Sequence, residues 1–456
     1  MAGETLVGPA PDGWEYTTLA VACQRGGGDI QTGPFGSQLH AADYVPIGIP
    51  SIMPQNIGDN RIVEEGIARI AQEDARRLSR YLVRAGDIVY SRRGDVERRA
   101  LVRDNENGWL CGTGCLRVRL GDRGPDPRFA TYYLGHPAVR EWIVRHAHGA
   151  TMPNLNTALL GACPFVVPPP NEQRAIAHIL GTLDDKIELN RRMNESLEAV
   201  ARALFKSWFV DFDPVRAKAE GRDSGLPNHI ANLFPDSFED SELGEIPTGW
   251  CFRTLSDVLS VLTDGSHSSP ATTEFGLPMA SVKDLTPWGV VVSTCRRISP
   301  RDFDGLVANG CQPSRGDILL SKDGARCLEI ACEYQQEDQI VLLSSVAILR
   351  PKKRNWSSYI HTWLTLPSTR IYLREGFVSG SAIPRAVLKD LKRVELLVPS
   401  DQAVGAFDDE VEVLRERIRN NVNESATLAR ARDALLPKLI SGEMRVGERT
   451  ERSIHE

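Results

Sequence analysis

The chain has 456 residues, of which 41% are hydrophobic and 25% are charged, and its formal net charge is −6. These values are typical of a globular protein that is long enough for two or three domains. The negative charge argues against a protein that coats nucleic acid regardless of sequence. A membrane-spanning helix is excluded, because no apolar run approaches the length of about 18 residues that it needs.

The N-terminal stretch "MAGETLVGPAPDGW" has neither the basic start nor the apolar run of a targeting signal, so we expect a cytoplasmic protein. Nine cysteines are present, which is an odd number, and none of them forms a CxxC pair or lies at a zinc-finger interval from a histidine. We therefore expect reduced structural thiols and no bound metal.

The segment from Arg61 to Arg128 contains 15 arginines and no lysine against 11 acidic residues, a surplus of four positive charges. The planar guanidinium of arginine suits guanine edges and phosphates. No lysine occurs anywhere before Lys186, so codon usage explains the arginines equally well. DNA contact and a plain solvated surface both remain open for this segment.

Several landmarks occur twice, in the same order. "GDIVYSRRG" from Gly86 returns as "GDILLSKDG" from Gly316, and "HGATMP" at 148–153 returns as "SGSAIP" at 379–384. "FVVPPPNEQ" likewise pairs with "LLVPSDQ", and "PDGW" at Trp14 pairs with "PTGW" at Trp250. The offset is about 230 residues for the first three pairs, too long for a solenoid. We predict a duplicated unit of about 150 residues with short strands, followed by a long helix.

Each predicted helix carries apolar residues that advance by alternating steps of four and three, which is a heptad seam. The seam positions of the first helix are Ile176, Leu180, Leu183, Ile187, Asn190, Asn194, Leu197, Ala201, Leu204 and Trp208. Those of the second are Phe407, Val411, Leu414, Ile418, Asn421, Ser425, Leu428, Arg432, Leu435 and Leu439, each separated from its counterpart by the offset of the repeat. So narrow a stripe favours pairing of the two helices.

Both seams turn polar at matching places, Asn190 and Asn194 in the first helix and Asn421 and Ser425 in the second. Buried polar residues in a seam cost stability but define register and partner. The alternative is that each helix caps its own domain and turns these residues to water. A helix from Asn171 to Trp208 has 38 residues and would extend roughly 57 Å, or roughly 17 base pairs of duplex DNA.

Three other segments complete the predicted organisation of the chain. The stretch 211–247 between the repeats is acidic, rich in proline and without a periodic pattern, so we interpret it as a long connector. The apolar run "IVLLSSVAIL" from Ile340 predicts one buried strand. Residues 442–456 are polar, and we expect a frayed tail.

The sequence lacks the characteristic motifs of a DNA-modifying enzyme. It contains no GxxxxGK[ST] phosphate loop, no GxSxG and no HExxH. The proline cluster "VPPPNE" has the wrong order for the segment with which an amino-methyltransferase grips a flipped base, and "CGTGC" is a lone GxG. We predict a protein that reads DNA and catalyses nothing.

At this point the motifs match a known family. "FGSQL", "PSIMPQNIG", "AGDIVYSRRG", "GATMPNLN", "LGEIPTGW", "LLPKLISGE" and the whole segment from Pro168 to Gly221 strongly resemble the specificity subunit of type I restriction-modification systems. The resemblance spans nearly the whole chain. It implies two target-recognition domains of mixed short strands and helices (an α/β, or α+β, fold), separated by two long antiparallel coiled-coil helices as a pseudo-twofold internal repeat.

The resemblance also implies partners. Two methyltransferase subunits would dock on the helices and motor-nuclease subunits would join them, with S-adenosylmethionine and ATP bound by these partners and no cofactor bound by this chain. Each domain would read half of a bipartite, asymmetric target in double-stranded DNA. Two readings stay open beside it: a self-contained methyltransferase or nuclease, and a structural adaptor that binds only protein. The expected division is domain 1 at 1–170, helices at 171–210 and 401–441, the connector at 211–247, domain 2 at 248–400 and the tail at 442–456.

Candidate DNA contacts follow from residue chemistry, because glycine and serine let a backbone approach phosphates, glutamine and asparagine suit adenine, and arginine suits guanine. For each of them a role in a turn or in the fold is an equal alternative, and the shared Gly-Asp of the repeat is interpreted as scaffold. The first domain contributes Gly33, Phe35, Gly36, Ser37, Gln38, Gln55, Asn56, Ser91, Arg92, Arg93 and Asn154. The second contributes Asp264, Gly265, Ser266, His267, Lys283, Ser321, Lys322, Asp323, Ser379 and Ser381.

Overall fold

The computed structural model describes residues 4–9, 11–149, 153–242, 244–380 and 383–446. Its contacts divide the chain into two compact units. Unit 1 consists of Met1–Glu188 together with Ser425–Glu456, and unit 2 consists of Leu189–Glu424. The domain limits expected from the sequence follow chain order, whereas each of these units contains part of both long helices.

Unit 1 is built on a four-stranded antiparallel sheet and a three-stranded mixed sheet. The first sheet has the order β4 (Asp29–Thr32), β10 (Cys115–Arg119), β7 (Ile88–Ser91), β8 (Arg99–Leu101). The second has the order β6 (Ala68–Ile70), β5 (Tyr44–Ile52), β9 (Leu110–Cys111), in which β5 and β9 are parallel. A further pair joins β3 (Glu15–Thr18) to β11 (Pro164–Val167), and the main helices are α1 (Leu19–Gly26), α3 (Pro127–Gly135) and α4 (Pro137–His146).

Unit 2 repeats this topology strand for strand. Its four-stranded sheet has the order β15 (Leu259–Asp264), β23 (Val346–Pro351), β20 (Ile318–Ser321), β21 (Ala331–Glu333). Its three-stranded sheet has the order β19 (Arg296–Ile298), β16 (Leu277–Ala280), β22 (Val341–Leu342), again with one parallel pair. The pair β14 (Cys251–Thr254) with β26 (Glu395–Val398) and the helices α10 (Pro300–Ala308), α11 (Trp356–Thr365) and α12 (Pro367–Phe377) complete it. The predicted internal repeat is confirmed.

The repeated "GDI" stretch supports the four-stranded sheet in both units. The carboxylate of Asp87 accepts hydrogen bonds from the guanidinium of Arg119 at 2.8 and 2.6 Å. The carboxylate of Asp317 accepts from Arg350 at 2.7 Å through both oxygens. Each aspartate is buried, and bidentate pairs of this kind are strong and geometrically specific. The shared aspartate is thus part of the scaffold.

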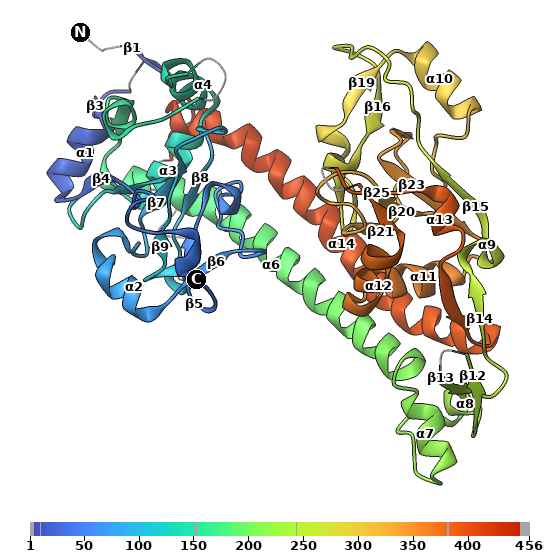
Figure 1. Ribbon diagram of the computed structural model, residues 1–456. Helices are drawn as coiled ribbons and strands as arrows, with labels where there is room; N and C mark the ends of the chain where they lie inside the picture. The colour runs from blue at the N-terminus through green and yellow to red at the C-terminus, as the bar shows by residue number, and fades with distance from the viewer. Residues whose placement is uncertain (1–3, 10, 150–152, 243, 381–382, 447–456) are drawn as a thin grey trace, which may run out of the picture. The chain divides into compact units, whose positions relative to one another are not determined.

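Two helices of 40 residues, α6 (Pro170–Phe209) and α14 (Asp401–Ile440), are the longest in the described chain, green and orange-red in Figure 1. In unit 1, Ile176 and Leu180 near the start of α6 pack in one core with Leu439 and Ile440 at the end of α14. In unit 2 the opposite ends meet, because Phe205 and Trp208 of α6 share a core with Phe407 of α14. The helices therefore pair antiparallel, and the expected fold class is confirmed.

All 20 seam positions are buried or half-buried. Outside the seam, Leu189, Val200 and Val413 are exposed. The polar seam residues Asn190, Asn194 and Asn421 are buried too, with at most 2% exposed. The alternative in which these residues face water is wrong.

The stretch 211–247 is more ordered than a bare connector. It contains α7 (Asp213–Ala219), α8 (Asn228–Ala231) and the hairpin of β12 (Phe238–Ser241) with β13 (Gly244–Pro247). Val215, Ile230, Phe234 and Ile246 are buried in the same core as Trp250. These apolar residues are irregularly spaced, so no periodic pattern in the sequence marks them as buried.

The apolar run from Ile340 is two strands instead of the single one that was expected. Strand β22 ends at Leu342 and β23 begins at Val346, and the two belong to different sheets. The break falls around Ser344 and Ser345, where the Ser345 carbonyl accepts a hydrogen bond from the Lys322 amide at 2.9 Å.

All nine cysteines are free thiols, and eight of them are buried. Burial raises the pKa of Cys23, Cys163 and Cys332 to about 12, so they stay protonated at neutral pH.

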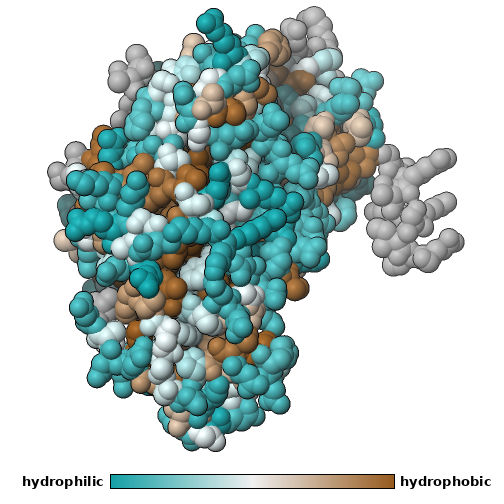
Figure 2. All heavy atoms as spheres, turned by 90° about the vertical axis from the view of Figure 1, so that its right-hand side faces the viewer, coloured by the Kyte–Doolittle hydropathy of each residue, from teal (hydrophilic) through white to brown (hydrophobic). Residues whose placement is uncertain are grey.

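Within the described ranges, no helix combines the length and the apolar character that crossing a bilayer requires. On the face drawn in Figure 2, hydrophobic side chains form separate groups among hydrophilic ones.

Candidate nucleic-acid interface

The segment that follows β7 is bound by its backbone to two other candidate segments of unit 1. The Arg92 amide donates to the Gly114 carbonyl at 2.8 Å, and the Gly94 amide donates to Pro153 at 3.1 Å. The Leu155 amide donates in turn to the Arg92 carbonyl at 2.9 Å. Residues 91–94 and 153–155, which are far apart in sequence, thus form one tip, called tip 1 below.

The same hydrogen bonds recur in unit 2 and form tip 2. The Lys322 amide donates to Ser345, the Gly324 amide donates to Pro384 at 2.9 Å, and the Ala386 amide donates to the Lys322 carbonyl at 2.8 Å. Residues 322–324 and 384–386 are therefore joined just as the two segments of tip 1 are. The tips have one backbone framework and different side chains.

Tip 1 presents cationic and aromatic groups. Arg93 is exposed, and Arg92 is half-buried with its guanidinium 5.8 Å from the centre of the Phe35 ring. Phe35 itself is 54% exposed. A guanidinium over an aromatic face is a favourable cation–π arrangement. The stretch 33–38 and tip 1 therefore lie next to each other. Both were predicted to contact DNA, and one DNA site could reach both only if they are neighbours.

Tip 2 presents a different pattern, because its lysine is internal. The Lys322 ammonium is buried, 3.1 Å from a carboxylate oxygen of Asp264 and 3.6 Å from one of Asp323. Its charge is neutralised inside the protein. Two exposed side chains nearby are Arg385, which contacts Asp323 at 3.0 Å, and His267, whose ring lies 3.3 Å from Asp264.

Several other candidates hold loops together through their side chains. The Asn56 amide donates to the Val63 carbonyl at 3.1 Å, and Gln38 accepts from the Tyr81 hydroxyl at 2.8 Å. Ser91, Ser321 and Ser266 are buried with bonded hydroxyls, and Gly33 and Gly265 are buried as well. For these residues the structure supports the alternative role in the fold.

The remaining candidates are surface residues whose DNA contact stays a prediction: Gly36, Ser37, Gln55, Lys283 and Ser379 are exposed, and Asn154 is half-buried. Ser381 lies outside the described residues.

In unit 1 a charged cluster ties the globular part to both helices. Arg432 of α14 donates to a carboxylate oxygen of Asp184 in α6 at 2.8 Å, and the hydroxyl of Tyr132 in α3 donates to the other oxygen at 2.6 Å. Burial alone would lower the pKa of Arg432, but Asp184 and Asp433 together outweigh burial and raise that pKa. The ion pair is 17% and 14% exposed, so solvent screens it weakly.

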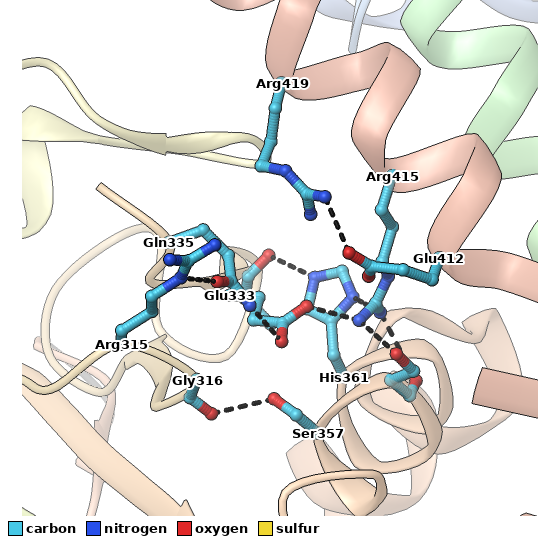
Figure 3. Close-up of polar contacts among 11 residues, drawn as sticks. Arg315, Gly316, Glu333, Gln335, Ser357, His361, Glu412, Arg415 and Arg419 are labelled. Carbon is cyan, nitrogen blue, oxygen red and sulfur yellow. Dashed lines mark hydrogen bonds and ion pairs between the residues drawn. The ribbon is translucent and has the colours of Figure 1, made fainter. Parts of the chain in front are cut away.

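Unit 2 has a corresponding cluster, in which the charge signs are arranged differently (Figure 3). The guanidinium of Arg415 in α14 contacts Glu333 of β21, the Ser358 hydroxyl at 2.6 Å and Nδ1 of His361 at 2.9 Å. Because an arginine can only donate, Nδ1 of His361 accepts, and its Nε2–H donates to the Ala331 carbonyl at 3.2 Å. Burial and then Arg415 lower the pKa of His361 to about 4, so this ring is neutral at pH 7.

A cavity of about 440 Å³ adjoins this cluster inside unit 2. Its wall includes Arg202, Arg415 and Arg419. Each of these arginines contacts a carboxylate: Arg202 contacts Glu198, and Arg419 contacts Glu412. The arginines of the wall are thereby already neutralised within the protein.

The chain is similar in sequence to proteins of known function. Residues 41–199 match the model of the type I restriction modification DNA specificity domain. Five curated proteins match the chain, and those named below are specificity subunits. The chain is similar over nearly its whole length to type I specificity subunits. The resemblance inferred from the sequence motifs is confirmed.

Two members of this family match over most of their length. The MjaIX specificity subunit of Methanocaldococcus jannaschii is 25% identical over 455 residues, which cover 98% of this chain and 96% of that protein. The HindI specificity subunit of Haemophilus influenzae is 24% identical and covers 87% of this chain and 95% of its own length. These matches therefore extend across both repeats.

Solved structures of the family are also similar to the chain. The S subunit of a type I system from M. genitalium has 15% identity and a TM-score of 0.45, over 93% of this chain and 96% of that one. The HsdS subunit of Thermoanaerobacter tengcongensis has 18% identity and a TM-score of 0.34, over 96% and 98%.

The sequence reasoning missed Arg385. This residue follows Pro384 in the second landmark, just as Asn154 follows Pro153 in the first, and Asn154 was named. Extending the repeat alignment by one residue would have found it.

Proposed function

We propose that this chain reads one bipartite, asymmetric DNA target in the cytoplasm, with each unit reading one half-site. The observation that carries the proposal is the pair of tips. Their backbone hydrogen bonds are the same, whereas Arg92 and Arg93 of one tip are replaced by a buried Lys322 and by Asp323 in the other. An equal framework with unequal side chains suits two unequal half-sites, because base edges are read by side chains.

The paired helices would set the gap between the half-sites. Both are 40 residues long, which at about 1.5 Å per residue is roughly 60 Å, or roughly 18 base pairs. Hydrogen bonds between Asn190, Asn194, Asn421 and Glu424 support one register of this pairing. A single register would permit a single gap.

The chain would act without catalysis of its own. In this proposal two methyltransferase subunits bind to the helices and supply S-adenosylmethionine chemistry, and motor-nuclease subunits supply ATP-driven cleavage. The absence from the sequence of phosphate-loop, methyltransferase and protease motifs supports it. So do the names of its relatives, which are subunits of type I restriction enzymes.

Mapping methylated adenines across a host genome tests the proposal. The chain is expressed with a type I methyltransferase subunit from the same organism, and the control expresses the methyltransferase alone. We expect one asymmetric motif of two short blocks with a constant gap, present only when the chain is present. No motif, together with no shift of a bipartite oligonucleotide by the purified chain, would leave only a protein-binding adaptor. Methylation by the chain alone would identify a self-contained enzyme.

A further inference from the structure

The two most exposed large apolar side chains of the described residues are Ile47 in unit 1 and Phe275 in unit 2. Ile47 is 90% exposed and Phe275 is 81% exposed. Single exposed apolar residues are ordinary on protein surfaces and need no explanation by themselves. These two, however, occupy the same place in the repeat.

Strand pairing establishes this equivalence. Ser51 of β5 pairs in parallel with Leu110, and Met279 of β16 pairs in parallel with Val341. Leu110 and Val341 are separated by the offset of the internal repeat. Each exposed apolar side chain lies four residues before the paired strand residue, so the two are structural counterparts although one is isoleucine and the other phenylalanine.

A tightly packed glycine begins the segment of chain that leads to each of these side chains. The Gly33 amide donates to the Cys115 carbonyl at 2.9 Å, and the Gly265 amide donates to its counterpart Val346 at 3.1 Å. A Cβ on Gly33 would lie 2.0 Å from a backbone oxygen, and one on Gly265 would lie 2.2 Å from the Leu342 oxygen. No other residue fits at either place without moving the strand beside it.

A second packed glycine directly follows each exposed side chain: Gly48 lies within β5, and Gly276 comes just before β16. A Cβ on Gly48 would lie 2.2 Å from the Ile70 oxygen, and one on Gly276 would lie 2.1 Å from the Ile298 oxygen. An arginine also binds each glycine, since Arg69 donates to the Gly48 carbonyl at 3.1 Å and Arg297 to the Gly276 carbonyl at 2.9 Å. The backbone that carries each apolar side chain is thus clamped, in the same way, in both units.

Two features of these segments indicate that DNA contacts the exposed side chains. The segments begin within the stretches 33–38 and 264–267, which already belong to the candidate DNA interface. A guanidinium binds the backbone carbonyl of the residue that follows each apolar side chain, and a cationic group at this place favours a phosphate backbone over a neutral protein surface. The difference between isoleucine and phenylalanine also suits two different half-sites.

We propose that Ile47 and Phe275 are DNA contacts, each packing against the sugar and base surface of its own half-site, with Arg69 and Arg297 positioned toward the flanking phosphates. Isoleucine and phenylalanine are among the side chains that proteins press against or between base steps in a groove. The inference rests on the proposed function, and it assigns specificity-determining residues to it.

The test uses the full chain with its methyltransferase and a labelled duplex that carries the mapped bipartite motif. Ile47→Ala and Phe275→Ala are compared with Ile371→Ala in α12, where the wild-type side chain is 58% exposed. We expect each of the first two variants to bind about 5- to 30-fold more weakly, the range of a lost base contact of about 1 to 2 kcal/mol. The Ile371 variant is expected to bind as the wild type does, and all thermal midpoints should stay unchanged.

Salt dependence and half-site substitution identify the contact. An apolar contact leaves the slope of log affinity against log salt unchanged, whereas a lost phosphate contact reduces it. Ile47→Ala should lower discrimination only at one half-site and Phe275→Ala only at the other. Affinities within twofold of the wild type would overturn the inference. So would loss of the co-purifying methyltransferase at normal DNA affinity, which would make the position a protein contact. A wild-type complex that binds no DNA would instead overturn the proposed function itself.

Discussion

Asn421 of α14 donates a hydrogen bond from Nδ2 to Oδ1 of Asn194 in α6 over 2.8 Å, and both side chains are buried. Removing one partner of such a bond leaves a buried polar group unsatisfied, which costs about 1 to 3 kcal/mol. Asn421→Ala should therefore lower the free energy of unfolding by that amount, as measured by urea denaturation.

The adjacent Asn420 is exposed on the same helix and provides the matched control. Asn420→Ala should change stability by less than about 0.5 kcal/mol. Equal effects of the two variants would contradict a role for the buried asparagine in helix pairing.

The ion pair of Arg432 with Asp184 gives a second prediction. Because both side chains are largely buried, Arg432→Ala should destabilise by about 3 to 5 kcal/mol, mainly through the carboxylate left without its partner. Arg430→Ala, at an exposed position of the same helix, should be close to neutral. If Arg432→Ala and Asp184→Asn were additive in a double-mutant cycle, the two groups would not interact energetically.

His361 predicts a pH dependence of stability. Its pKa is about 4 in the folded protein and about 6.5 when unfolded, so between these values the unfolded chain binds the extra proton. Stability should thus be intact above about pH 6.5 and should fall on acidification toward pH 4, by at most about 1.4 kcal/mol per pH unit for this proton. The depressed pKa of Glu333, whose burial is outweighed by Arg415 and His361, adds a loss in the same direction at still lower pH.

Urea denaturation from pH 4.5 to 7.5 measures this slope. His361→Phe removes the titrating group and should flatten the slope, whatever its effect on stability at pH 7. His229→Phe, at an exposed site, should leave it as it is. A wild-type stability that does not change over this range would contradict the neutral, buried ring.

The two tips predict separable effects on DNA. Arg92→Ala should weaken or relax recognition at one half-site by about 1 to 3 kcal/mol, and Arg385→Ala at the other. The measurement is binding to duplexes in which one half-site at a time is scrambled. Uniform weakening on all sequences would instead identify phosphate contacts.

The long helices could be predicted nearly completely from the sequence. Their seam follows from a strict repeat of side-chain size along one helix face, and every predicted seam position is buried or half-buried. The internal repeat was also visible, because landmarks such as Asp87 and Asp317 serve the same scaffold in both units. Local pattern and local structure agree in these elements.

The interface could be predicted only in part, because long-range packing decides which side chains reach the surface. Lys322 has the sequence context of a reading residue, yet Asp264, from a strand much earlier in the chain, neutralises it inside the protein. Gly48 and Gly276 pack closely against the backbone of strands that follow later in the chain. No periodicity marks such contacts.

The central claim is that the paired helices measure the gap between half-sites, and lengthening both of them tests it. Asn190 donates to Glu424 at 2.8 Å, so one heptad that continues the seam, inserted after Glu188 and again after Glu424, extends both helices at the same level. The added rise is roughly 10 Å, or roughly three base pairs. As a control, seven residues are inserted after Gly225, outside the helices.

The readout is the methylated motif of the lengthened protein with its methyltransferase, mapped across the genome. The account predicts unchanged half-site sequences separated by a gap about three base pairs longer, and an unchanged gap for the control. A lengthened protein that methylates the original motif with its original gap would contradict the account.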